Sequence, residues 1–197
     1  TTASKPFDFD PGDIQLNNVE FVYRDNRYDD YREGIDFEDI RVANLKAEIG
    51  DVEFDADTVL AKIHNISFIE KSGFKLEYFE ADAKFTPESM EYENLLIKTP
   101  YSQINTHLVF NYDHISDFEE FVDKVKINST FEETTLSSKD LYYFAYELKG
   151  LDQEITFSGK IRGTIPQLRG RKLEIAFGNH SYFKGDISIA GLPNFEE

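Results

Sequence analysis

Residues 155–192, ITFSGKIRGTIPQLRGRKLEIAFGNHSYFKGDISIAGL, place an apolar side chain at almost every second position and punctuate these runs with glycines. A two-residue period puts apolar side chains on one face of a sheet and leaves the other face wet. The stretch therefore predicts strands that share one apolar face. The residues on that face are Ile155, Phe157, Ile161 and Ile165, then Leu173, Ile175 and Phe177, then Phe183, Ile187 and Ile189.

The N-terminal half shows the same alternation with repeated slips. The segment GIDFEDIRVANLKAEIG, residues 34–50, has extended character throughout and would span roughly 50 Å at ~3.3 Å per residue. Its apolar parity changes from Ile35 and Phe37 to Ile40 and Val42, and again at Leu45. Such slips indicate β-bulges, and long strands with repeated bends predict a curved sheet. Similar slips occur in residues 57–73 and 74–88.

Two short helices are expected within this β-rich chain. Residues 117–122, DFEEFV, begin with an aspartate suited to an N-cap, and residues 138–148, SKDLYYFAYEL, carry an apolar stripe at helical spacing. Strands are expected before and between them, through Ile104–Phe110 and through Val125–Phe131. The predicted fold class is all-β, a long, curved and bent sheet that forms an open apolar groove, with two short helices.

Composition restricts the function classes. The 197 residues include 18 Phe, 11 Tyr and no Cys, so disulfides and thiol chemistry are excluded. The net charge of −17 argues against nucleic acid as a partner. Residues 155–191 nevertheless hold six basic and only two acidic residues. These charges suit either solvated outer faces or a basic rim that meets lipid phosphates.

No motif for catalysis or metal binding is present. The segment FDFDPGD supplies Asp8, Asp10 and Asp13, but its spacing matches no EF-hand loop. The four histidines, His64, His107, His114 and His180, form no paired ligand spacing. Nucleophile elbows, P-loops and dinucleotide fingerprints are absent, and pairs of carboxylates arise by chance among 38 acidic residues. The sequence predicts a protein that is not an enzyme and has no metal or cofactor.

A family resemblance enters with the C-terminal third. The phrase LSSKDLYYFAYELKG (residues 136–150), the strand ITFSGKIRGTI, the link PQLRGRKLEIAFG and the closing FKGDISIAGLPNF occur in that order. Together they resemble the TamB branch of the AsmA-like family of bridge-like lipid transfer proteins, large envelope proteins of Gram-negative bacteria. The resemblance covers residues 35–195 and is distinctive over the last sixty. Tyr146 departs from the pattern, which often has proline before the Glu-Leu pair.

The resemblance implies a groove-shaped "β-taco" lined with apolar residues, within an inner-membrane-anchored, periplasmic protein. It implies an anchor outside this fragment, a TamA-type barrel partner in the outer membrane, and passage of phospholipid or support of outer-membrane protein assembly. The chain is then a fragment of a larger protein with three parts. These are an N-terminal strand and charged loop (residues 1–33), a bent sheet (34–135), and a helix with a C-terminal groove segment (136–197).

The candidate groove lining follows from the alternation. Acyl chains could lie against Phe157, Ile161, Ile165, Leu173, Ile175, Phe177, Phe183, Ile187 and Ile189. Alternating apolar residues also build the core of a closed sandwich, so lining and plain core remain alternative interpretations. The corresponding alternatives in function are a non-catalytic periplasmic or surface β-sandwich that binds sugar or protein, and a structural spacer within an envelope machine.

Overall fold

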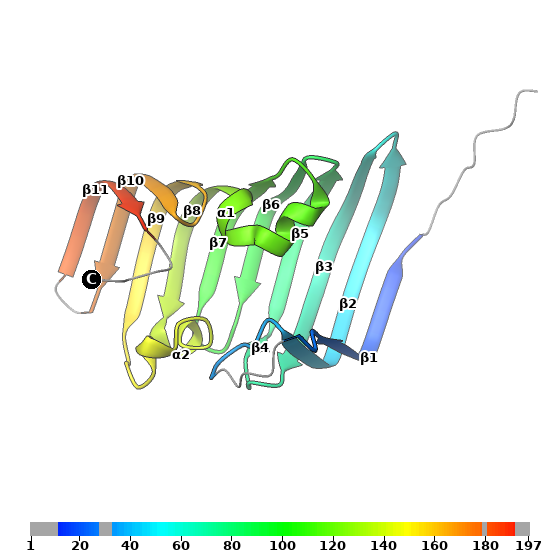
Figure 1. Cartoon of the computed structure of the whole chain (residues 1–197), viewed down its shortest axis with the longest axis horizontal. Coiled ribbons are helices and arrows are strands. Elements are labelled where there is room, and N and C mark those ends of the chain that lie inside the picture. Colours follow the sequence, from blue (N-terminus) through cyan, green and yellow to red (C-terminus); the bar gives the residue numbers. More distant parts are fainter. Residues whose placement is uncertain (1–11, 28–32, 179–180, 192–197) are drawn as a thin grey trace, which may run out of the picture.

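The computed structural model describes residues 12–27, 33–178 and 181–191. They form one open antiparallel sheet, in the order β1-β2-β3-β5-β6-β7-β8-β9-β10-β11, with β4 paired to β3 (Figure 1). The strands are β1 Ile14–Arg24, β2 Asp39–Asp55, β3 Thr58–Glu70, β4 Lys75–Leu76, β5 Tyr78–Thr86, β6 Ser89–Lys98, β7 Gln103–Asn111, β8 Lys126–Ser137, β9 Glu154–Gly163, β10 Gln167–Phe177 and β11 Ser181–Ala190. The all-β, curved-sheet prediction is confirmed.

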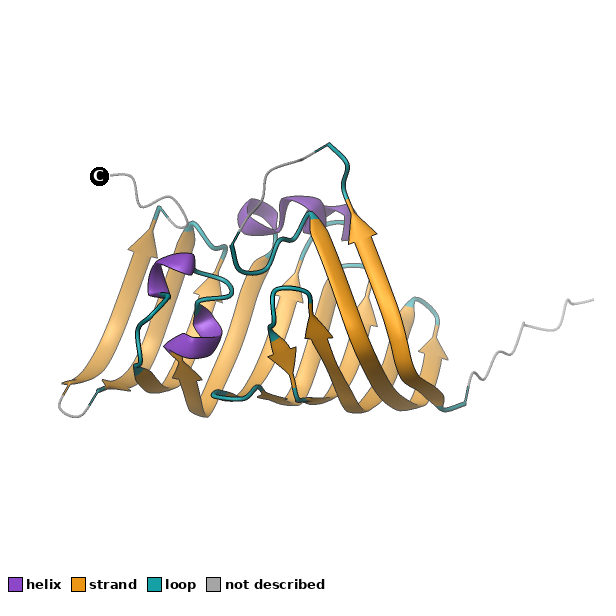
Figure 2. Ribbon diagram, turned by 90° about the horizontal axis from the view of Figure 1, so that it is seen from below, coloured by secondary structure: helices purple, strands orange, loops and turns teal. Residues whose placement is uncertain are grey.

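The pairing register aligns the apolar residues of successive strands. On β6, Met90 pairs with Phe85 of β5 and with Phe110 of β7, and Phe110 pairs in turn with Ile127 of β8. Partners in an antiparallel ladder project from the same face, so one apolar face continues from β1 to β11. The sheet curves around this face, which is concave (Figure 2). Strand β8 contains residues 135 and 136, so the division expected there between the bent sheet and the C-terminal segment falls within one strand.

Bulges bend the strands without turning the apolar residues outward. Six strand residues other than glycine have positive φ and accompany a register shift, namely Asn18, Asn44, Asp51, Asn94, Glu133 and Lys172. Each bulge places one extra residue in its strand, so residues three apart face the same way. Tyr92 and Leu95, on either side of Asn94, illustrate this, since they pair with Leu108 and Thr106 of β7. The parity slips at residue 44 and after Ile63 of β3 are therefore bulges, as predicted. The slip between Phe37 and Ile40 instead falls at the turn before β2, and the slip in residues 74–88 falls at the break between β4 and β5.

The most buried part of the concave face lies beside the bulges. Leu95 is 2% exposed, Ser129 1% and Thr134 0%. The hydroxyls there have partners, because Thr106 Oγ1 lies 2.6 Å from Ser129 Oγ and also bonds the Thr130 carbonyl at 2.9 Å. The small side chains of Thr106, Ser129 and Thr134 permit the strands to bend sharply here. We call this row of residues, together with Leu95, the crease.

Both expected helical regions exist, each as two short helical pieces. The first is η1 Ile115–Glu120 followed by α1 Phe121–Lys124, and the second is α2 Ser138–Leu141 followed by η2 Tyr146–Leu148. A continuous helix over 138–148 is wrong, because Ala145 takes an extended conformation with φ −139° and ψ 92°. We refer to residues 115–124 as the upper helical segment and to residues 138–148 as the lower helical segment (Figure 1).

The extended segment predicted from Gly34 also begins later than expected. Strand β2 starts at Asp39, and residues 33–38 form turns and irregular chain. The Ile35 amide donates to the Tyr143 carbonyl at 2.7 Å, outside any strand ladder. A Cβ on Gly34 would lie 2.5 Å from the same carbonyl oxygen. The loop before β2 is therefore fastened to the lower helical segment, a long-range contact that alternation in the sequence does not reveal.

The Asp117 carboxylate caps the start of the upper helical segment, and this contribution depends on pH. Its carboxylate accepts hydrogen bonds from the His114 amide at 3.0 Å and the Asp113 amide at 2.9 Å, and the His114 bond is the main cause that lowers the pKa of Asp117 below 3.8. A carboxyl whose pKa is lower in the folded state stabilises that state above its unfolded pKa and loses this contribution as pH falls through the folded value.

We therefore expect the upper helical segment to loosen only when the pH falls below 3.8. An NMR titration of the Asp117 carboxyl and of the His114 amide should show a shared midpoint below that value. In Asp117→Asn the amide step should vanish. A midpoint for Asp117 at or above 3.8 would contradict the capping role.

Candidate functional site

The structure brings eight of the nine predicted lining residues onto one face. Ile175 pairs with Phe157 of β9 and with Phe183 of β11. Along the rest of these strands, pairing aligns Ile161 and Ile187 with Gly170, and Ile189 with Leu168. Phe177 and Leu173 occupy the same parity of β10. The exception is Ile165, which lies in the turn between β9 and β10, not in a strand.

The lining residues differ in how accessible they are. Phe177 is 45% exposed and Ile189 43% exposed, whereas Leu173 is only 5% exposed. Leu173 lies over glycines, since a Cβ on Gly170 would meet its Cδ1 at 2.3 Å, and a Cβ on Gly159 would meet its Cδ2 at 2.9 Å. Leu173 is therefore part of the crease, while the residues farther from the crease are open to a ligand.

Gly163 at the end of β9 has a stricter steric role. Its φ is +132°, and a Cβ there would come within 2.0 Å of the Gln167 carbonyl oxygen. We expect Gly163→Ala to lower the free energy of unfolding by about 2 kcal/mol, because the β9–β10 turn must open. Urea denaturation measures this. Gly150→Ala is the matched control, with φ +84° and nothing within 4 Å. Equal losses for the two variants would show that the close approach at Gly163 is unimportant.

Both ends of the sheet leave large apolar side chains exposed on the concave face. At the β1–β2 end, Phe21 is 52% exposed, Tyr23 47% and Phe54 55%. At the β10–β11 end, Phe177 and Ile189 are exposed. Within the described residues no second sheet covers either end. Exposed apolar surface of this extent usually marks a place where a ligand or another molecule binds.

Aromatic residues of the helical segments cover the middle of the face. Phe110 of β7 packs edge-on against Phe118 and Phe121 of the upper helical segment, with ring centroids 6.2 and 5.6 Å apart. Near the β3–β4 connection, Phe74 packs against Tyr143 and Phe144 at 5.6 and 5.2 Å. The two segments sit at opposite ends of the strands (Figure 1). The concave face is thus partly covered at its centre and open at its sides.

Charge is almost absent from the concave face. Leaving the bulge positions aside, Glu70 is the one charged residue of this parity in the described strands, and it is 3% exposed. Its carboxylate accepts from the Ser72 amide at 2.7 Å and the Arg41 amide at 3.3 Å. The face therefore offers apolar contact and no catalytic pair of titratable groups along its strands.

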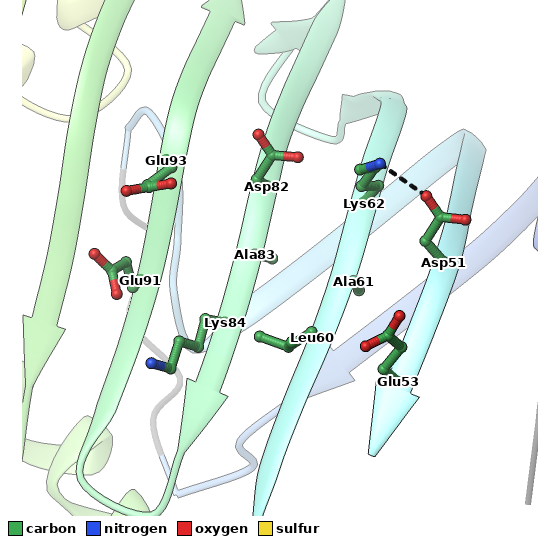
Figure 3. Close-up of a pocket in the computed structure, with 10 residues that line it drawn as sticks. All are labelled: Asp51, Glu53, Leu60, Ala61, Lys62, Asp82, Ala83, Lys84, Glu91 and Glu93. Carbon is green, nitrogen blue, oxygen red and sulfur yellow. Dashed lines mark ion pairs between the residues drawn. The ribbon is translucent and has the colours of Figure 1, made fainter. Parts of the chain in front are cut away.

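The convex face is highly charged. A shallow depression of about 600 Å³ spans β2, β3, β5 and β6 and is lined mainly by charged residues (Figure 3). Lys62 points to Asp51 with an N–O distance of 2.9 Å, and this hydrogen bond lowers the pKa of Asp51. Glu53, Asp82 and Glu93 lie around them. Acidic side chains on this outer face account for much of the negative charge of the chain.

One histidine cluster escaped sequence reasoning. His107 Nε2 lies 2.7 Å from Glu91 Oε1, and the ligand atoms of His107, Glu91 and Glu93 all lie within 4.8 Å of one another. These are donor types that zinc accepts. The bulge at Asn94 shifts the register of β6 against β7, so spacing along the chain could not bring the three together. His64 and His114 lie apart from this cluster in the described chain, while His180, Asp8 and Asp10 lie outside the described residues.

The described helices are all too short or too polar to cross a membrane. Comparison of the chain with protein-family models, curated proteins and solved structures found no match.

Proposed function

We propose that this chain is a segment of a TamB-like, periplasm-spanning envelope protein that shields phospholipid acyl chains on its concave face during transport between the inner and outer membranes. The observation that carries the proposal is a single apolar face, continuous over ten neighbouring strands and without a covering sheet in the described residues. Nine strand spacings of ~4.8 Å give this face a width of roughly 43 Å. Because the helical segments partly cover the middle of this width, the open ends of the face are where an acyl chain would lie.

The physical basis is burial without directional contacts. Each methylene that leaves water for this face contributes about 0.8 kcal/mol, whichever strand it meets. Neighbouring strands offer similar contacts, so an acyl chain that slides across them exchanges one apolar contact for another at little cost. The near absence of charge on the face serves the same end, because a charged side chain would have to lose its water wherever a methylene passed.

The wider setting of the proposal rests on the order of the C-terminal motifs. A TamA-type outer-membrane barrel as partner, an inner-membrane anchor outside these residues and a periplasmic location all come from the resemblance to TamB. So does the associated role in assembly of outer-membrane proteins. The curved open sheet supports this setting, since it has the groove-like form that the resemblance implies.

Lipid extraction tests the proposal. We expect the chain, expressed in a Gram-negative host and purified without detergent, to release phospholipid on solvent extraction and to show phospholipid-sized mass adducts in native mass spectrometry. Stripped protein should take up a fluorescent-acyl phospholipid. Lipid-free protein that takes up no labelled phospholipid would count against the proposal. It would favour the alternative of a non-catalytic binding module, whose sandwich would need a second sheet that the described residues do not supply.

A further inference from the structure

A compact array of basic side chains lies on the convex face at the C-terminal end of the sheet. In the ladder between β9 and β10, Arg169 pairs with Arg162, and Arg171 pairs with Lys160. All four are exposed and alternate with residues of the apolar face, so they project to the convex side. Two like-charged pairs therefore lie directly side by side. We call these four residues the basic array.

The basic array is only partly neutralised. Arg171 Nη1 lies 2.7 Å from Asp186 Oδ2. Lys160, Arg162 and Arg169 form no ion pair with any residue that the structure describes. Glu174 is engaged by Lys184, and Glu132 and Glu133 of the neighbouring strand β8 form no ion pair with the array. Three positive charges thus face solvent together without an ion-pair partner among the described residues.

Such an arrangement opposes folding. Like charges directly opposite each other across two strands destabilise a sheet. The acidic residues of β2–β6 offer little relief, because β6 is three strand spacings from β9 and β2 is farther still. At ~4.8 Å per spacing, even β6 is roughly 14 Å away, beyond the Debye length of about 8 Å at physiological ionic strength. Glu132 of β8 lies diagonally beside Lys160, but Arg162 lies opposite Asn128 of β8 and Arg169 opposite Ser188 of β11. A bound anion would therefore relieve the repulsion between the two arginines.

We propose that the basic array docks this end of the sheet onto the phosphate headgroups of an anionic phospholipid bilayer. The array lies on an exposed outer face rather than in a pocket, so it fits an extended anionic surface better than a single enclosed ion. The guanidinium group of an arginine can bind two phosphate oxygens at once. Both residues of the Arg169–Arg162 pair are arginines, and so is one residue of the Arg171–Lys160 pair. Tyr182 on the same convex side is 62% exposed, which suits an aromatic ring at a headgroup layer.

This inference is separate from the function of the apolar face, which lies on the opposite side of the sheet. The sequence suggested a basic rim along the groove. In the structure these basic side chains project from the outer face of the strands, not from an edge of the groove. Docking through the outer face would leave the concave face free. Acyl-chain binding and bilayer docking can therefore fail independently.

Vesicle sedimentation tests the docking. The chain should bind vesicles of phosphatidylcholine with phosphatidylglycerol, and not vesicles of phosphatidylcholine alone. Arg162→Ser with Arg169→Ser should weaken binding about 30-fold, since each basic residue near an anionic surface contributes a factor of about five. The matched control is Lys62→Ser with Lys84→Ser, which removes the same charge elsewhere on the convex face. The control should bind within about twofold of the wild type, since its lysines lie more than a Debye length from the basic array.

Three results would overturn the proposal. Equal weakening by both double variants would show that net charge, not the basic array, governs binding. Displacement from the vesicles by inorganic phosphate, at a concentration that potassium chloride of matched ionic strength does not reproduce, would show a single-oxyanion site. Self-association that the arginine double variant abolishes, without vesicle binding by the wild type, would show that the array meets acidic residues of a second copy.

Discussion

Ile175→Asp and Ile187→Arg are each expected to lower phospholipid binding by at least 100-fold, and the double variant to abolish it. Both residues lie on the concave face of the last two strands and are half-buried. An ionised side chain at either position must lose its water when an acyl chain covers it, at a cost of several kcal/mol, and a 100-fold loss needs about 2.7 kcal/mol. Native mass spectrometry and uptake of labelled phospholipid measure the effect.

Sequence neighbours supply the controls. Ala176→Asp and Ser188→Arg place the same charges one residue along each strand, on the convex face. These variants should bind phospholipid as the unmodified chain does, and circular dichroism should show that all four retain the sheet. Unchanged uptake by a folded Ile175→Asp/Ile187→Arg variant would refute acyl-chain binding on this face. Unfolding of both concave variants would instead mean that the two isoleucines belong to a closed core.

Asp140→Ala is expected to lower the free energy of unfolding by about 4 kcal/mol, the largest stability effect of any single substitution considered for this chain. Asp140 is 5% exposed, and its Oδ2 accepts from Thr99 Oγ1 at 2.6 Å, Ser102 Oγ at 2.6 Å and the Tyr101 amide at 3.2 Å. Ser102 Oγ in turn accepts from the Ser137 amide at 3.0 Å. Alanine would leave the buried Ser102 hydroxyl without its acceptor and would remove an acceptor from the part-buried Thr99 hydroxyl and Tyr101 amide.

Urea denaturation measures this loss, with Asp152→Ala as the control. Asp152 is 78% exposed at its side chain and pairs with Lys139, so its loss should cost about 0.5 kcal/mol. Asp140→Asn should fall between the two, because an amide oxygen retains one acceptor without the charge. If Asp140→Ala and Asp152→Ala were equally stable, the hydrogen bonds at Asp140 would not hold the lower helical segment to the β6–β7 turn.

The lower helical segment is itself coupled to the apolar face. Burial beside Phe74 and a hydrogen bond with Tyr142 raise the pKa of Tyr143 to about 12, so its hydroxyl remains neutral throughout the physiological range. Loss of Asp140 would release Tyr143 and Phe144 from Phe74 as well as the turn. Both effects should appear in one unfolding transition, since the same short segment makes the contacts.

Alternation along the strands was sufficient to predict the fold class and the shared apolar face. The C-terminal strands follow it most clearly, because Ile175, Phe183 and Ile187 sit where a two-residue period places them. The parity slips were informative for a physical reason. A bulge at Asn44 inserts one residue while keeping the apolar side chains inward, so the slip there marks a bend, whereas the slip after Phe37 marks the turn before β2.

Features that depend on distant contacts were beyond the sequence pattern. Helical periodicity continued through Phe144 and Ala145, yet the chain breaks there so that Tyr143 and Phe144 reach Phe74. The site at His107 needs a register shift between β6 and β7. Ile165 has the correct parity but falls in a tight turn, whose position depends on the approach of Gly163 to Gln167.

The most direct test of the account places a photoreactive amino acid at residue 175 in one variant and at residue 176 in another. These neighbours project to the concave and convex faces, respectively. After irradiation in a Gram-negative host, we predict phospholipid adducts at residue 175 and none at residue 176, as detected by mass spectrometry of the purified chain. Adducts at neither position, or equal adducts at both, would contradict the claim that the concave face carries acyl chains.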